Sequence, residues 1–278
     1  MRIMKKFKVG IQLYSLRNAM GKDMDATLRS VKEMGYDYVE FAGYFGKSAQ
    51  EVKAILDKYN LKAVSVHQDI DLFEEEGKAA VDYLITLGVK YCAIPSYSVD
   101  EFYNNWDVTI ERFIKASRLL NEGGIQRMYH NHEFEFQKID GEFILDKLYN
   151  TIPNELLQPQ FDTCWIHYAG ENPAEYMKKY NGKIEVLHLK DFICEKLGGG
   201  PVYSLIDEKG NEIKSNSREE NGFKYVPLGS GIQNWDAILE TAENAGIEYV
   251  IVEQDASVDR DPMEAAKISR DYLKTFGP

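Results

Sequence analysis

Short apolar runs alternate with longer amphipathic runs along almost the whole chain. Apolar runs of about four to eight residues between turn signals are typical of buried strands, whereas apolar positions three and four residues apart are typical of helices. The runs that we interpret as strands are Phe7–Tyr14, Tyr38–Phe41, Leu61–Val66, Tyr91–Ile94, Gln126–Phe136 with its end in a loop, Leu157–Phe161, Ile184–Leu189 and Tyr249–Val252. The predicted helices are Asp23–Met34, Ser48–Tyr59, Glu75–Leu87, Asp100–Asn121, Phe143–Tyr149, Pro173–Tyr180, Asn234–Ala245 and Asp261–Phe276.

Eight strands that alternate with eight helices, spaced roughly 25 to 40 residues apart, are typical of an α/β fold of the (β/α)8 type, the TIM barrel. Two helix ends carry the expected signals: Gly35 is a C-cap glycine, and Ser48 with Glu51 forms a capping-box pattern. A doubly wound open sheet is the alternative. However, the first strand is not followed by a G-x-G-x-x-G loop, and Gly229–Gly231 is too short and too late to replace it. We therefore predict a single barrel domain over residues 1–278.

The segment 192–226 interrupts this alternation of strands and helices. It contains Gly198–Gly200, many charged residues and a predicted hairpin around Asp207–Asn211. We interpret it as an insertion after the seventh strand. It would serve either as a lid or as an arm that joins copies of the chain in a homo-oligomer.

Composition limits the class of protein. The chain has 278 residues, of which 44% are hydrophobic and 28% are charged, as in globular proteins with a large core. A net charge of -12 and a pI near 5.0 argue against nucleic acid or an anionic membrane as a partner. There is no apolar span of membrane length, and the N-terminus lacks the apolar core of a signal peptide. Three cysteines without a C-x-x-C pair predict neither a disulfide framework nor a thiolate zinc site, so a reducing cytoplasm is the simplest location.

The stretch Gln126–Phe136, QRMYHNHEFEF, is the densest group of ionisable residues in the chain. It contains His130, His132, Glu133 and Glu135, although the whole chain has only five histidines. Side chains alternate between the two faces of a strand, so His130 and His132 are expected to point the same way. A strand that runs into a loop is where α/β enzymes hold their chemistry, because the strand fixes position and the loop gives access.

In a barrel, the carboxyl ends of all strands converge on one mouth. The polar side chains predicted at or just beyond those ends are Glu40, His67, His130, His132, Glu133, Glu135, Asp162, His188 and Glu253. Imidazole and carboxylate groups together suit one divalent metal ion, and manganese, zinc, cobalt and magnesium are all admissible. Singly, these residues have ordinary explanations: Asp162 could cap a turn, and His188 could be a core histidine. Their shared position at successive strand ends favours a metal site.

Several segments also carry a resemblance to a known family. They are VGIQLYSLR at the start, LKAVSVH, MYHNHEFEF, FDTCW, VLHLKD, PLGSG followed by Asn234 and Trp235, and YVIVEQD. On these segments the chain resembles the xylose isomerase-like TIM barrel family of sugar and sugar-phosphate isomerases and epimerases, near its inosose dehydratase and tagatose epimerase branches. The resemblance implies one divalent metal at the mouth, bound by a strand-five acid, Asp162, His188 and Glu253.

The fifth strand departs from the family pattern. Relatives that epimerise sugars carry a glutamate there, and we predict that His130 replaces it as a metal ligand, with Glu133 or Glu135 as substitutes if the loop folds inward. The resemblance implies two metal-bound glutamates that move a proton on opposite faces of the substrate. Here Glu253 remains, so His132 or Glu135 must supply the second acid/base group.

The resemblance implies a metal-dependent sugar isomerase or epimerase that removes a proton next to a metal-bound carbonyl. The first alternative is a lyase that dehydrates, or a hydratase that hydrates, an inosose or a 3-keto-sugar, because it needs the same polarised carbonyl. An inactive sugar-binding or scaffold barrel is an alternative of another class, and bound metal would distinguish it. A nuclease with this fold would need a basic groove and more histidines.

Further residues are predicted to contact a small carbohydrate substrate. They are His67, Trp165, His167, Lys190 and Asp191. Trp165 and His167 follow Asp162, where relatives place a substrate-contacting histidine, while the Lys-Asp pair could contact a hydroxyl or phosphate or form a local ion pair. Glu40 is predicted to orient its neighbours by hydrogen bonding. Because no phosphate-cradling loop is visible, the expected substrate is an unphosphorylated sugar, cyclitol or keto-sugar.

Overall fold

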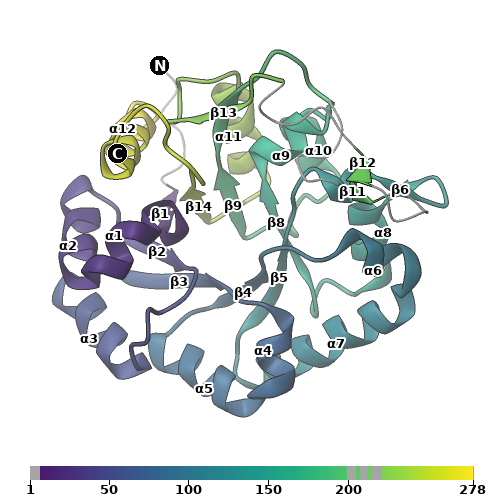
Figure 1. Ribbon diagram of the computed structural model, residues 1–278, viewed down its shortest axis with the longest axis horizontal. Coiled ribbons are helices and arrows are strands. Elements are labelled where there is room, and N and C mark those ends of the chain that lie inside the picture. The colour runs from purple at the N-terminus through teal and green to yellow at the C-terminus, as the bar shows by residue number, and fades with distance from the viewer. Residues whose placement is uncertain (1–6, 199–204, 207–211, 214–220, 278) are drawn as a thin grey trace.

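A computed structural model describes residues 7–198, 205–206, 212–213 and 221–277, and its centre is a closed barrel of eight parallel strands. The strands follow the order β1-β14-β9-β8-β5-β4-β3-β2, and helices surround them (Figure 1). Their bounds are β1 (Lys8–Gln12), β2 (Tyr38–Phe41), β3 (Lys62–His67), β4 (Tyr91–Ile94), β5 (Gln126–His130), β8 (Gln158–Asp162), β9 (Val186–Leu189) and β14 (Tyr249–Val252). The predicted (β/α)8 architecture is confirmed.

The helices mostly follow the predicted periodicity, with five exceptions. Their bounds are α1 (Arg17–Lys22), α2 (Met24–Met34), α3 (Ala49–Lys58), α4 (Ile70–Glu75), α5 (Lys78–Leu87), α6 (Val99–Asn104), α7 (Trp106–Glu122), α8 (Ile144–Thr151), α9 (Thr163–Tyr168), α10 (Pro173–Lys178), α11 (Trp235–Asn244) and α12 (Pro262–Lys274), with 3-10 helices η1 (Leu13–Leu16) and η2 (Phe134–Phe136). The helices predicted as Glu75–Leu87 and Asp100–Asn121 are wrong in extent, because Gly77 at φ 54° and Asn105 interrupt them. The pattern also missed α1, α4 and α9, the last of which starts directly after Asp162.

Local signals explain several helix ends. Ser48 and Glu51 form a reciprocal capping box at the start of α3, in which the Ser48 amide donates to Glu51 Oε2 at 2.8 Å and the Glu51 amide donates to Ser48 Oγ at 3.3 Å. Gly35 ends α2 at φ 96°, a left-handed conformation that glycine adopts without steric penalty. Both predicted signals are therefore confirmed.

Two apolar layers hold the barrel together. Outside the strands, side chains such as Tyr129 of β5 pack under the helices, with ring centroids 5.9 Å from Phe113 and 6.1 Å from Phe102. Inside the barrel, a second cluster fills the end where the strands begin. Its members are Tyr38, Val64, Tyr91, Ala93, Met128, Val186, Tyr249 and Ile251, which we call the floor. Fully burying one large apolar side chain stabilises a fold by about 1.5–3 kcal/mol.

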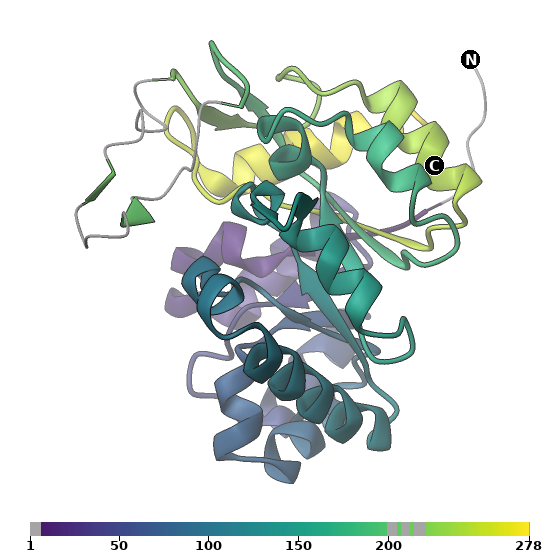
Figure 2. The same ribbon diagram turned by 90° about the vertical axis from the view of Figure 1, so that its right-hand side faces the viewer.

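The segment after β9 forms short antiparallel pairs outside the barrel. β10 (Asp191–Ile193) pairs with β13 (Lys224–Val226). β11 (Leu205–Ile206) pairs with β12 (Glu212–Ile213), and these two strands are the short green arrows apart from the barrel in Figure 2. This pairing agrees with the predicted hairpin, whose tip at Asp207–Asn211 lies outside the described residues. Its role as a lid or an oligomer arm stays a prediction. One further pair, β6 (Lys138–Ile139) with β7 (Glu142–Phe143), precedes α8.

Two compositional predictions bear on the structure. Cys92, Cys164 and Cys194 are all free thiols. Within the part of the chain that the structure describes, none of the helices has both the length and the apolar character needed to cross a membrane.

Candidate metal centre and active site

Four buried side chains converge at the end of the barrel where the strands finish, which we call the mouth. His130, Asp162, His188 and Glu253 each offer one ligand atom, and these four atoms lie within 4.8 Å of one another. None of the four residues is more than 5% exposed. Parallel pairing produces this convergence, because Asp162 is in register with His188, which is in register with Ile251, two residues before Glu253.

The Asp162 carboxylate is held in a fixed orientation by its position at the start of α9. Its Oδ1 caps that helix by accepting the Cys164 amide at 2.8 Å, and its own amide donates to Asn131 Oδ1 at 3.0 Å. Its Oδ2 therefore faces the cluster, 3.7 Å from His130 Nε2. A carboxylate that caps a helix with one oxygen and presents the other inward is preorganised as a metal ligand.

Glu40 lies beneath the cluster and fixes the histidines. Its carboxylate accepts hydrogen bonds from Gln12 at 2.7 Å, Ser65 at 2.5 Å and Gln160 at 2.6 Å. The same group lies 2.7 Å from His188 Nε2 and 3.0 Å from His67 Nε2.

These contacts set the charge of the layer. Burial raises the pKa of Glu40, but His67 and His188 outweigh burial and hold that pKa well below its usual range. The Glu40 carboxylate thus stays ionised and orients His188 as a metal-binding histidine requires.

His188 presents its other nitrogen to the cluster. Its Nδ1 lies 2.9 Å from Glu253 Oε2. Burial lowers the pKa of His188, yet Glu40 and Glu253 outweigh burial and raise that pKa to about 10. An ion that binds at Nδ1 must therefore displace a proton, so metal affinity should depend on pH.

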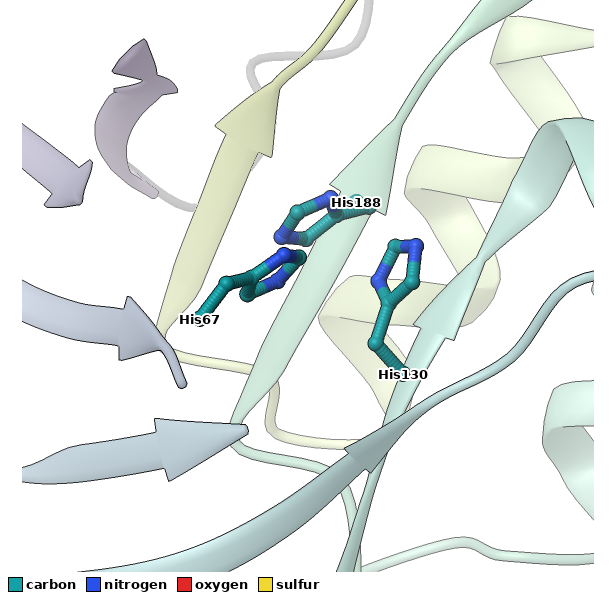
Figure 3. Close-up of side chains that lie close together, drawn as sticks. All are labelled: His67, His130 and His188. Carbon is teal, nitrogen blue, oxygen red and sulfur yellow. The ribbon is translucent and has the colours of Figure 1, made fainter. Parts of the chain in front are cut away.

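Three imidazole rings, from β3, β5 and β9, point toward one another at the centre of the mouth (Figure 3). Their centroids are 4.8 Å apart for His67 and His130, 4.6 Å for His130 and His188, and 5.3 Å for His67 and His188. Burial and the neighbouring histidines lower the pKa of His130 well below its usual range. Among the described residues, His130 Nδ1 has no hydrogen-bond partner. A neutral imidazole beside a second imidazole and two carboxylates fits a divalent transition-metal ion.

Lys190 extends into the same cluster. Its ammonium group lies 2.8 Å from Asp162 Oδ2, 2.9 Å from Glu253 Oε2 and 3.1 Å from Asp255 Oδ1. The residue is 1% exposed, and its ammonium lies 5.1 Å from the centre of the Trp165 ring. The mouth therefore holds a fixed positive charge of its own.

A cavity of about 700 Å³ opens over the cluster. Its lining includes the predicted site residues His67, His130, His132, Lys190 and Glu253. Sequence reasoning missed Tyr14, Arg17, Gln68, Asp69, Ser96, Tyr225 and Asp255, which also line it. Asp69 and Asp255 carried a usable signal, because each follows a predicted site residue, His67 or Glu253, by two positions just beyond a strand. The cavity is large enough for one sugar or cyclitol ring.

The structure does not bring Trp165 and His167 into this cavity. Trp165 is fully buried, with its ring centroid 5.4 Å from that of His132 and stacked on Phe223 at 5.8 Å. His167 Nδ1 lies 2.9 Å from Gln233 Oε1, and His167 is not part of the cavity lining. Both placements follow from α9, because a helix that starts right after Asp162 turns the next side chains into the surrounding layer.

Asp191 also lies outside the cavity lining and anchors a loop instead. Its Oδ2 accepts hydrogen bonds from the amides of Gly229 at 2.9 Å and Gly231 at 3.1 Å, and from Trp235 Nε1 at 3.0 Å. A Cβ added at Gly231 would collide with Asp191 Oδ1. The PLGSG segment and the tryptophan after it are therefore partners of this buried carboxylate.

Glu135 faces away from the cavity. Its carboxylate accepts from the Tyr129 hydroxyl at 2.5 Å and from the His132 amide at 2.8 Å. Burial raises the pKa of Glu135 to about 8, although these hydrogen bonds lower it. Glu135 thus braces the backbone that carries His132, and only His132 of the two lines the cavity. Glu133 is buried as well and is not part of the cavity lining.

The closed barrel and its buried centre of histidines and carboxylates define a class of protein. Comparison with known proteins shows which class this is. The profile of the xylose isomerase-like TIM barrel family matches residues 28–276, so the chain belongs to this family.

Among curated relatives, the chain is 26% identical over 274 residues to an inosose dehydratase of Clostridium botulinum strain Alaska E43, covering 88% of each chain. It is 24% identical over 277 residues to an inosose dehydratase of Geobacillus kaustophilus, covering 90% of this chain and 86% of that one.

Solved structures share the fold. A sugar phosphate isomerase/epimerase of Parabacteroides distasonis superposes with a TM-score of 0.78 at 22% identity, covering 97% of this chain and 94% of that chain. The IOLI protein with a bound zinc atom superposes with a TM-score of 0.68 at 17% identity, covering 97% of each chain.

Proposed function

We propose that the chain is a divalent-metal-dependent lyase that removes water from an inosose or a related keto-sugar. The observation that carries this proposal is the acid/base inventory of the mouth. His130 stands where epimerising relatives are expected to have a glutamate, and Glu135 is engaged by Tyr129 away from the cavity. Epimerisation by proton exchange would use two carboxylates on opposite faces of the substrate. His130 and Glu135 thus do not supply the second carboxylate of such a pair.

The donor set supports metal dependence. His130, Asp162, His188 and Glu253 would hold the ion, and two imidazoles with two carboxylates favour manganese, cobalt or zinc over magnesium. A divalent ion bound there would polarise a carbonyl oxygen and so acidify the neighbouring C–H bond. The zinc in the IOLI protein, a relative in fold alone, is consistent with this assignment.

The chain's own groups then move the protons. Glu253 takes the proton from the carbon next to the carbonyl, and the electrons of that C–H bond form a C=C bond. As the C–O bond of the neighbouring hydroxyl breaks, His132 gives its proton to the departing oxygen, which leaves as water. Glu253 and His132 together need to serve only one elimination, and both residues line the cavity. The names of the curated relatives support this choice.

Lys190, His67 and the cavity rim would position the substrate. The Lys190 ammonium is a permanent donor for a substrate hydroxyl, and His67 is held at the lower wall by Glu40. Because the strands fix both groups, a ring of defined stereochemistry would be selected.

An isotope experiment tests the proposal. Protein loaded with Mn²⁺, Co²⁺ or Zn²⁺ is incubated in deuterated water with a panel of inososes, keto-hexoses and 3-keto-sugars, and products are followed by NMR and mass spectrometry. Loss of water from one inosose or keto-sugar is the expected result. His188→Ala protein, treated identically, is the matched control for adventitious metal.

Isomerase or epimerase activity is the second candidate, favoured by the structural neighbours of that description. Deuterium at a carbon next to a carbonyl without loss of water would establish it and overturn the lyase proposal. Neither deuterium uptake nor water loss with any metal would instead support a barrel that only binds its ligand.

A further inference from the structure

We propose that Lys190 is an internal counter-ion that competes with the divalent ion for Asp162 and Glu253, and thereby determines the metal affinity of the centre. The inference rests on the proposed metal centre and concerns a property that the reaction alone would not require. It makes Lys190 more than a substrate contact.

The atoms involved are the first support. Lys190 Nζ contacts Asp162 Oδ2, the oxygen turned toward the cluster, because Oδ1 is occupied as the cap of α9. It also contacts Glu253 Oε2, the same oxygen that lies 2.9 Å from His188 Nδ1. The ammonium therefore contacts the two carboxylate oxygens that also face His130 and His188 in the four-ligand cluster.

The second support is that Lys190 has somewhere to remain when an ion arrives. Asp255, its third partner, offers Oδ1 at 3.1 Å and Oδ2 at 3.3 Å, and it is not part of the four-ligand set. The aromatic rings of Trp165 and Tyr225 lie 5.1 and 5.8 Å from the ammonium and add an attractive surface. When an ion replaces the ammonium at Asp162 and Glu253, the ammonium then needs only to shift toward Asp255. It does not need to move into solvent.

Electrostatics gives the direction of the effect. Without a cation, Asp162 and Glu253 would be two ionised carboxylates inside the protein, and burying charges without partners is strongly unfavourable. Lys190 provides that partner and keeps the metal-free centre folded. Once an ion is bound, the ammonium and the ion repel each other across the shared carboxylates, and the low dielectric of the interior strengthens the repulsion. Lys190 should therefore stabilise the metal-free protein and weaken metal binding.

The experiment compares Lys190→Met and Lys190→Gln with Lys190→Arg and the wild type. Mn²⁺ affinity is measured by competition with a fluorescent chelator, and the melting temperature is measured with and without Mn²⁺. We expect the two neutral variants to bind Mn²⁺ at least about tenfold more tightly, and Lys190→Arg to stay within about threefold of the wild type. Metal-free Lys190→Met should melt roughly 5–10 °C lower, and Mn²⁺ should recover the loss.

A matched control removes a cation elsewhere. Lys78 is 78% exposed and pairs only with Asp82 among the ion pairs of the described residues, so Lys78→Met changes the net charge equally but should leave Mn²⁺ affinity unchanged. Equal or weaker Mn²⁺ binding by both neutral variants would overturn the inference. If the neutral variants fold only with Mn²⁺ present, its release into excess chelator is measured instead: slower release than from the wild type supports the inference, and equal or faster release overturns it.

The outcomes separate this inference from the proposed function. A wild type that binds no divalent ion would overturn both. A wild type that binds Mn²⁺ and dehydrates its substrate, with affinity indifferent to Lys190, would overturn the counter-ion role alone.

Discussion

The floor and the mouth of this barrel are built from the same strands, yet they contain opposite chemistry. Moving two residues along a strand keeps a side chain inside the barrel and changes only its layer. The floor and mouth partners on four strands are Tyr38 and Glu40, Met128 and His130, Val186 and His188, and Ile251 and Glu253. On each of these strands, the floor residue is apolar, and the residue two positions further along the strand, in the mouth, is ionisable.

The two layers differ in what they contribute. In the floor, Tyr249 packs edge-on against Tyr38 at 5.4 Å and Tyr91 at 6.1 Å, which closes the barrel with dispersion and apolar burial. In the mouth, carboxylates and histidines are equally buried and stabilise one another only through exact pairing partners such as Glu40 and Lys190. The floor therefore supplies stability that offsets the unfavourable burial of charge in the mouth.

The largest effect is expected when the mouth loses a ligand. His188→Ala should lower metal affinity enough to empty the centre and reduce turnover by at least about 10³-fold, because a bound ion supplies several kcal/mol and each 1.36 kcal/mol is tenfold in rate. Elemental analysis and steady-state kinetics measure the two effects. Val186→Ala, one step lower on β9, should keep its metal. Full metal occupancy in the His188 variant would refute the assignment.

The next effect separates two neighbours at the mouth. His132→Ala should reduce turnover by roughly 10²- to 10⁴-fold while metal content is retained, because general acid catalysis contributes about that much. His130→Ala should lose the metal. If the two variants behave the other way round, the ligand and the acid are exchanged. If neither affects metal content or turnover, both assignments, of His130 as ligand and of His132 as acid, are wrong.

A substitution in the floor should show the opposite profile. Met128→Ala should lower the free energy of unfolding by about 2–5 kcal/mol, since the side chain is fully buried and leaves a cavity. Its metal affinity should equal that of the wild type, because the residue lies one layer below His130. Chemical denaturation and Mn²⁺ titration test the pair of expectations. A large loss of metal with unchanged stability would erase the distinction between floor and mouth.

The last effect concerns Glu135, a buried carboxyl group outside the mouth. Its pKa is raised from 4.5 to about 8 by burial, so between these pH values the folded protein binds a proton that the unfolded chain has released. The free energy of unfolding should therefore fall as pH rises through this window, by up to about 1.4 kcal/mol per pH unit.

Glu135→Gln removes this titration and keeps an acceptor for the His132 amide. The variant should match the wild type at pH 5 and exceed its melting temperature by roughly 5 °C at pH 9. Thermal unfolding of metal-free protein at pH 5, 7 and 9 measures the difference. A constant difference across the three pH values would show that Glu135 does not titrate as its burial implies.

Local sequence signals were sufficient for much of the fold. The bounds of β2, β4 and β14 were predicted to the residue, and the capping box at Ser48 and Glu51 is present. Such features depend on neighbours within a few positions of the chain, so a periodic pattern and a cap residue suffice to specify them. The convergence of His130, Asp162, His188 and Glu253 was also predictable, because parallel strands in a barrel bring their carboxyl ends together.

Side-chain direction beyond the strand ends was decided by tertiary structure. Trp165 is turned from the cavity by α9 and by stacking on Phe223, a residue 58 positions later (223 minus 165). Asp191 was expected to meet substrate, but its hydrogen bonds go to a loop around Gly231 that reaches it from about 40 positions away. No local pattern contains these partners.

The sequence by itself thus determined which residue types reach the mouth, since strand periodicity and strand order leave little freedom there. Only the tertiary structure decided which of them face the cavity and with what charge. Lys190 shows the reason: its role depends on carboxylates from three different segments, Asp162, Glu253 and Asp255, and on burial that removes water from all of them. Electrostatic interactions in a buried cluster depend on distances in space, which sequence spacing does not encode.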